Sequence, residues 1–182
     1  MDPSRRRFLM TACMSAAPGC AGAPARPAQA PARRSFQPLD EPDHATPILP
    51  EELSEIRTRI IESHNKIRAG VKLGKLVPSQ KLTLAAQAHA EDMAARRKMS
   101  HSGGDGSSPA DRVKRRGYRY RRVGENVAYG HFTEDRVMKG WMESRHHKDN
   151  ILGGFSEIGV GCAVGEDGKR YWCVNFGLPA TR

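Results

Sequence analysis

Proline is distributed very unevenly along this chain, and the distribution limits where a folded domain can lie. Nine of the twelve prolines fall within the first fifty residues, among many alanines. Such a segment offers few core side chains and favours open conformations. The rest of the chain, about 130 residues, is long enough to fold by itself. We therefore predict one folded domain over residues 50–182, preceded by a disordered Pro/Ala-rich tether over residues 21–49.

The first twenty residues have the order of features found in export signals. The run Arg5-Arg6-Arg7-Phe8-Leu9 resembles the twin-arginine pattern, and a short apolar stretch follows it as far as Pro18. That stretch is far shorter than the ~20 residues that cross a membrane as a helix. Cys20 could become the lipidated first residue of a lipoprotein, or cleavage at small residues over 21–23 or 28–30 could release a soluble product. We predict an exported protein, periplasmic, secreted or anchored by a lipid, with no transmembrane helix.

Positive charge is concentrated in the predicted domain. The formal charge of the chain is +10, and seven of the eleven residues over 112–122 are basic, with two tyrosines among them. Such a pattern can bind nucleic acid, but export takes the protein away from it, so no nucleic acid partner is expected. The segment is either a solvated basic loop or a patch that contacts an anionic envelope surface. The arginines of the predicted patch are Arg115, Arg116, Arg119, Arg121 and Arg122.

Hydrophobic periodicity predicts helices alternating irregularly with strands. An apolar stripe predicts a helix over about residues 50–71, and further helices are expected over 82–99, over 109–117 and after Thr133, a good N-cap residue. Strands are expected over about 118–129, 157–165 and 169–176, the last two as a hairpin. The pattern is typical of an α+β layered fold.

The last two cysteines flank a hairpin turn signal. Asp167-Gly168 is typical of a two-residue turn, because both central residues of that turn need positive φ. If the turn centres there, Cys162 and Cys173 lie directly opposite each other. A disulfide would suit an exported protein, and the alternative is a pair of buried thiols. The pair would occupy a hydrogen-bonded position, the wider of the two antiparallel pairings.

Six short motifs in order resemble those of the CAP superfamily, also called SCP-like extracellular proteins. The superfamily includes cysteine-rich secretory proteins, venom allergens and plant pathogenesis-related proteins. The resemblance covers about residues 57–178 and is carried by His64-Asn65-Lys66-Ile67-Arg68, Met99-Ser100-His101-Ser102, Gly124-Glu125-Asn126, Trp141 with Ser144, His147 and Asn150, Glu157-Ile158-Gly159-Val160-Gly161, and Tyr171-Trp172 to Asn175-Phe176. It implies a bacterial member with a three-layer α/β/α sandwich around a central antiparallel sheet. It also implies a shallow cleft built around two histidines and acidic residues.

The resemblance also assigns residues to that cleft. By motif position the two histidines are His101 and His147, and Glu125 is the acid. Glu143 is a weaker candidate, because its offset from Trp141 differs by one residue from the plant pattern. The residues expected to fix helix and loop contacts are His64, Asn65, Arg68 and Asn126.

Two kinds of chemistry are open to these residues. His101 and His147 could hold Zn²⁺ or another divalent cation, with Glu125 as a base toward bound water. Without a metal, the same side chains would form a polar cluster that pins loops to the sheet. The first predicted function is a binding module for a lipid, a sterol-like molecule or a cell-wall component. The alternative is a hydrolase or peptidase in the same cleft, although neither nearby serine has a nucleophile-elbow sequence.

Overall fold

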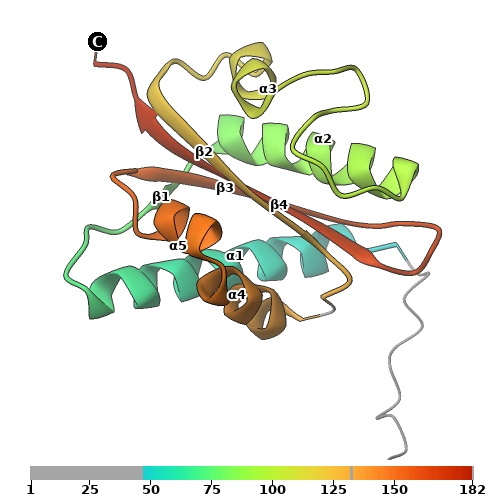
Figure 1. The fold of residues 1–182 in the computed structure, drawn as a ribbon, viewed down its shortest axis with the longest axis horizontal. Coiled ribbons are helices and arrows are strands. Elements are labelled where there is room, and N and C mark those ends of the chain that lie inside the picture. The colour runs from blue at the N-terminus through green and yellow to red at the C-terminus, as the bar shows by residue number, and fades with distance from the viewer. Residues whose placement is uncertain (1–46, 132, 182) are drawn as a thin grey trace, which may run out of the picture. The chain divides into compact units, whose positions relative to one another are not determined.

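The computed structural model describes residues 47–131 and 133–181. The predicted export signal, lipidation at Cys20 and the tether as far as residue 46 lie outside these residues. The described elements follow in the order α1 (Pro50–Gly70), β1 (Val77–Pro78), α2 (Gln80–Arg96), α3 (Pro109–Arg115), β2 (Tyr120–Tyr129), α4 (Glu134–Glu143), α5 (Arg145–Ile151), β3 (Glu157–Val164) and β4 (Arg170–Pro179) (Figure 1).

The strands form one sheet with the order β1-β3-β4-β2. The three long strands are antiparallel, as predicted, with β4 between β3 and β2. The two-residue β1 was not predicted, and it adds a short parallel pairing along β3. Consequently β2 forms one edge of the sheet.

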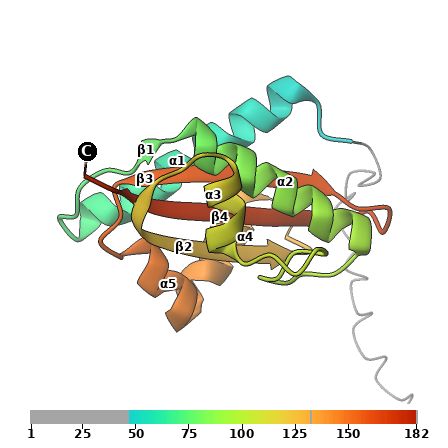
Figure 2. The same cartoon turned by 90° about the horizontal axis from the view of Figure 1, so that it is seen from above.

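Helices cover both faces of this sheet. α2 and α3 lie on one face, and α1, α4 and α5 lie on the other (Figures 1 and 2). The larger core lies on the α1 side and contains Ile60, Trp141 and Trp172. The α2 side is packed with smaller residues, including Ala86 and Ala90. The predicted α/β/α sandwich is therefore confirmed.

Two glycines of β3 allow α2 to lie directly on the sheet. A Cβ on Gly159 would come within 2.2 Å of the Leu82 backbone carbon, and one on Gly161 within 2.4 Å of that of Ala86. Both distances are far below any real contact, so only glycine fits at these two positions. The close approach explains why the layer between α2 and the sheet is built from alanines.

The first helix is formed by local signals together with a buried stripe. Pro50 occupies the first turn, with Glu51 and Glu52 beside it at the positive end of the helix dipole. The buried positions recur every fourth residue, which places them on one face against the sheet. They are Ile56, Ile60, His64 and Arg68.

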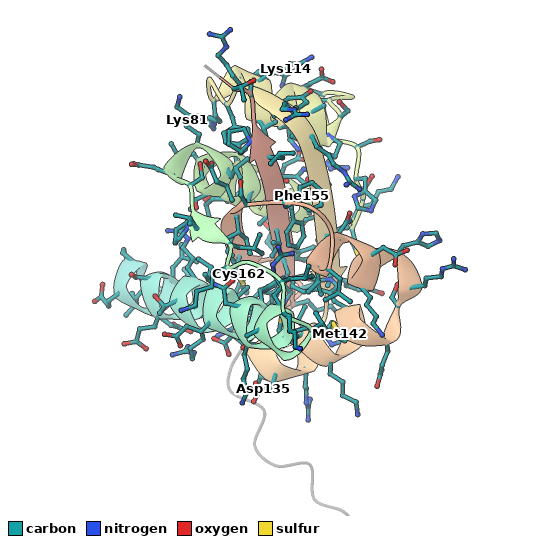
Figure 3. All side chains as sticks on the ribbon, turned by 90° about the vertical axis from the view of Figure 1, so that its left-hand side faces the viewer. Lys81, Lys114, Asp135, Met142, Phe155 and Cys162 are labelled. Carbon is teal, nitrogen blue, oxygen red and sulfur yellow. The ribbon has the colours of Figure 1, made fainter. Side chains whose placement is uncertain are left out.

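The β3–β4 hairpin corrects the disulfide prediction. The N–H of Gly165 donates to the carbonyl of Lys169 at 2.9 Å, so the loop has three residues rather than two, ending at Gly168 with φ +70°. Cys162 is consequently paired with Trp172 and not with Cys173. A slip of one residue sends the two thiols to opposite faces of the sheet. Cys162 lies on the α1 side (Figure 3) and Cys173 on the α2 side, and both thiols are free and buried.

Candidate functional site

Glu125 lies at the centre of a polar cluster at the edge strand β2. Its side chain is only 2% exposed, and the residue pairs in register with Asn175 of β4. Strand alternation points it to the same face as Val127, toward α2 and α3. A carboxylate this deeply buried needs hydrogen-bond donors around it.

Donors reach both carboxylate oxygens of Glu125. His101 Nδ1 lies 2.9 Å from Oε1, and the guanidinium of Arg112 donates to Oε2 at 2.6 Å. The thiol of Cys173 lies 3.4 Å from Oε2. The Asn175 amide satisfies its partners when its nitrogen faces Glu125, at 3.2 Å from Oε2. Glu125 is therefore an ion-paired, hydrogen-bonded carboxylate.

The electrostatics of the cluster keep Glu125 ionised. Burial by itself raises the pKa of Glu125, but the hydrogen bond from His101 and the charge of Arg112 outweigh burial and leave the pKa below its ordinary value. His89 lies close by, with its Nε2 4.0 Å from Glu125 Oε1. Burial lowers the pKa of His89, which favours the neutral imidazole.

The other half of the site comes from α5, on the opposite face of the sheet. The next strand residue, Asn126, points the other way and donates to the backbone carbonyl of His147 at 3.1 Å. Asn150 then donates to the Asn126 side-chain oxygen at 2.9 Å and to the Glu125 carbonyl at 3.1 Å. The motif Gly124-Glu125-Asn126 thus ties the His101 loop to one face of β2 and α5 to the other.

His101 and His147 lie near enough for one to influence the titration of the other. His101 is 56% exposed, whereas His147 is half-buried. Burial lowers the pKa of His147, and the positive charges of His101 and His146 lower it further. The structure therefore places His101, Glu125 and His147 in one region around β2, and their role as a cleft stays a prediction.

The donor set falls short of a resident zinc site. Catalytic zinc takes three protein ligands and structural zinc takes four. Within residues 47–131 and 133–181, no group of three or more His, Cys, Asp or Glu side chains is arranged to hold a metal. His101 already uses Nδ1 on Glu125, which leaves one nitrogen of that ring free. Binding of a divalent cation stays a prediction.

Two residues of the α1 motif, Asn65 and Arg68, hold the loops that follow α1 and α5. Arg68 donates to the backbone carbonyls of Gly74, Ile151, Gly153 and Phe155, which holds the chain after α5 against α1. Asn65 exchanges two hydrogen bonds with the backbone of Leu76, at 2.7 and 3.0 Å.

His64, which begins the same α1 motif, is fully buried. Its Nδ1 bonds the carbonyl of Ile60 at 2.7 Å, and its ring packs beside Trp141 and Phe176. These contacts join α1 to the sheet and to α4.

Glu143 is placed apart from the cluster. Its side chain is 67% exposed and lies 3.8 Å from Lys139, one turn earlier in α4. In the described part of the chain no hydrogen bond or ion pair joins Glu143 to Glu125, His101 or His147.

The predicted arginine patch is divided by the fold between α3 and β2. Arg115 pairs with Asp105, and Arg122 lies over the ring of Phe155, 4.9 Å from its centre. Arg116, Arg119 and Arg121 are exposed.

Sequence reasoning missed Arg112, Cys173 and Asn175 as partners of Glu125. Period-two alternation places Cys173 and Asn175 on one face of β4, and the predicted strand could have indicated that face. Arg112 carried no such signal, because it stands in a basic run and its role depends on how α3 packs over β2.

Comparison with known families and proteins follows the same residues. Residues 61–176 match the model of the cysteine-rich secretory protein family, CAP. The chain is 34% identical over 122 residues to protein YkwD of Bacillus subtilis, covering 66% of this chain and 48% of YkwD. It is 29% identical over 119 residues to membrane protein YlbC of the same organism, covering 65% of this chain and 33% of YlbC. The chain therefore spans half the length of these relatives or less.

Solved structures share the fold. An extracellular protein containing an SCP domain from Bacillus anthracis has a TM-score of 0.65 at 26% identity, covering 73% of this chain and 45% of that protein. An outer surface protein of Borrelia burgdorferi has a TM-score of 0.63 at 21% identity, covering 68% and 92%. None of the described helices is long and apolar enough to cross a membrane.

Proposed function

Because the chain belongs to the CAP family of cysteine-rich secretory proteins, we propose that it is an exported binding module for a lipid or another cell-envelope ligand. Export is supported by the similar SCP-domain protein of Bacillus anthracis, which is extracellular, and by the predicted signal. The ligand would contact the surface formed by His101 and His147 at the β2 edge. A sterol-like molecule and a cell-wall component belong to the same proposal.

The state of Glu125 is the observation that favours binding over catalysis. A general base needs a free lone pair and a pKa near the working pH. Both oxygens of Glu125 instead accept hydrogen bonds from the protein, and the pKa of Glu125 is lowered. Such a carboxylate holds His101 and Arg112 in place rather than removing a proton from water.

Hydrolysis is the alternative in a different functional class. It would require Glu125 to leave Arg112 and become a base, or the histidines to activate a nucleophile themselves. A hydrolase would lose turnover on peptide or ester substrates when Glu125→Gln is introduced. If the domain is a binding module, neither the parent chain nor the Glu125→Gln variant would turn over these substrates.

The test of binding uses three probes and one matched pair of variants. Co-sedimentation of the full chain would be measured with phosphatidylglycerol vesicles, with sterol-containing vesicles and with isolated peptidoglycan. We expect retention by at least one probe, and a loss of about tenfold in affinity in the double variant His101→Ala/His147→Ala.

His146→Ala is the matched control, because His146 is an exposed histidine on the same helix. Circular dichroism would establish that every variant is folded. Equal losses in the control and the double variant would show that the β2 edge is not the binding surface. Turnover that disappears in the folded Glu125→Gln variant would establish the hydrolase instead.

A further inference from the structure

A cavity lies between α2 and α3, and its wall residue Arg112 also contacts Glu125. It is a cavity of ≈ 500 Å³, closed on a third side by the loop over residues 103–107. Neither His101, Glu125 nor His147 lines it. The polar residues on which its chemistry depends are His89, Asp92, Asp105, Arg112, Arg115 and Arg116.

The cavity has room because one turn of α2 carries only methyl groups there. Ala85 and Ala88 are three residues apart and therefore form one side of the helix facing the cavity. Larger side chains at these positions would fill the space between α2 and α3. Arginines from α3 form the opposite wall.

The acidic side chains of the wall already have partners within the protein. Asp92 accepts from Arg96 and from the backbone N–H of Gly104. Asp105 pairs with Arg115 and accepts from the backbone N–H of Ser107. Little acceptor capacity is therefore left on these two carboxylates for a cationic ligand.

Donor capacity, in contrast, is in excess. Arg116 is exposed, and its guanidinium makes no hydrogen bond or ion pair with the described part of the chain. Arg112 is 8% exposed, and its Nε has no hydrogen-bond partner among the described residues. A buried donor without an acceptor is costly, so a ligand oxygen at this wall would be stabilising.

One acceptor in the wall is also without a partner. His89 uses Nε2 on the carbonyl of Ser100, at 2.7 Å, which makes Nε2 the donor and Nδ1 the acceptor. Nδ1 is buried 3.8 Å from Asp92 Oδ2, an acceptor like itself, and accepts no hydrogen bond from the described residues. A hydroxyl group is the ligand group that could donate to it.

We propose that this cavity binds a phosphate ester of a polyol, with the phosphate against Arg115 and Arg116 and a hydroxyl directed toward His89. Arginine forks suit phosphate oxygens. Lys81 and Lys114 project from α2 and α3, the two helices that line the cavity (Figure 3), and add positive charge to this part of the domain. The same chemistry is present in a phosphatidylglycerol headgroup and in a soluble glycerol phosphate. This inference is independent of the function proposed for the β2 edge.

The test is titration calorimetry of the full chain with sn-glycerol 3-phosphate. We expect Arg116→Gln to weaken binding at least about tenfold, the loss of one charge-assisted contact. Ala88→Phe fills the cavity without changing charge, and the partial exposure of Ala88 keeps the substitution out of the core. It should weaken binding by a similar factor. Arg119→Gln removes the same charge outside the cavity wall and should change affinity by less than about twofold.

Equal weakening by Arg116→Gln and Arg119→Gln, or unchanged affinity in folded Ala88→Phe, would overturn the proposal, because binding would then reflect general charge. Absence of any binding by the parent chain would overturn it as well. Phosphatidylglycerol vesicles distinguish the two sources. Vesicle retention that Ala88→Phe abolishes identifies a lipid headgroup, and binding of the soluble ester alone identifies a free one.

Discussion

Burial of His64 as a neutral ring should make the stability of this domain fall in mild acid. His64 Nδ1 donates to the Ile60 carbonyl, so Nε2 is the unprotonated nitrogen, and it is buried without a partner among residues 47–131 and 133–181. Protonation would place a charged N–H among Trp141 and Phe176 with no acceptor. Burial accordingly lowers the pKa of His64 from 6.5 to about 4.

The sign and the size of the effect follow from proton linkage. Below pH 6.5 the unfolded chain binds a proton at this position and the folded chain does not, so the free energy of unfolding falls as the pH falls. Between pH 7.5 and 4.5 the difference between the two pKa values of His64 corresponds to a loss of about 2.5 kcal/mol. The contribution is fully present above pH 6.5 and is lost down to about pH 4.

The assay is urea unfolding at several pH values, followed by circular dichroism, with His64→Leu for comparison. Leucine has a similar volume and carries no charge, and the Ile60 carbonyl keeps its backbone hydrogen bond within the helix. At pH 7.5 the two proteins should differ by less than about 1.5 kcal/mol. On going to pH 4.5 the parent should lose about 2.5 kcal/mol more than the variant. All other titrating groups cancel in this comparison, so parallel pH profiles would refute the reasoning.

Three further predictions concern the sheet, the thiols and the metal. Gly161→Ala should lower the free energy of unfolding by about 3 kcal/mol in urea denaturation, because its Cβ would lie 2.4 Å from the Ala86 backbone carbon; an unchanged midpoint would show that α2 can move away. Burial raises the pKa of both Cys162 and Cys173. Because both thiols are free and buried, a reductant should leave the melting temperature unchanged, and a thiol reagent should label Cys162 and Cys173 only after unfolding; loss of both of these thiols in an oxidised chain would instead indicate the disulfide. Zinc titration checks the predicted divalent cation. Any zinc binding should disappear in the single variant His101→Ala, because a site with only two histidine ligands does not hold the ion with one. Zinc binding retained by that variant would place the ion elsewhere.

Local sequence signals were sufficient for most of the fold. Pro50 and the buried stripe through Ile56 and Ile60 predicted α1, and alternation predicted the three long strands. The motifs that resemble CAP proteins predicted the sandwich, and the family match agrees. Each of these signals acts over a few neighbouring residues or is a pattern in chain order.

The register of the β3–β4 hairpin could not be determined from local sequence signals. Asp167-Gly168 is compatible with a turn of two or of three residues, and the two choices differ by one position in register. Packing of β3 between α1 and α2 selects the longer loop, because only that register places the glycines of β3 under α2. The positions of the two thiols followed from this choice.

The polar cluster around Glu125 was likewise predictable from the sequence only in part. Motif order was enough to name His101, Glu125 and His147, because those residues stand in recognisable short patterns. Only the tertiary structure could add Arg112 to Glu125 and place Glu143 out in solvent. A carboxylate becomes a buried, paired anchor or an exposed base according to which side chains from distant segments pack around it, and no local pattern specifies that packing.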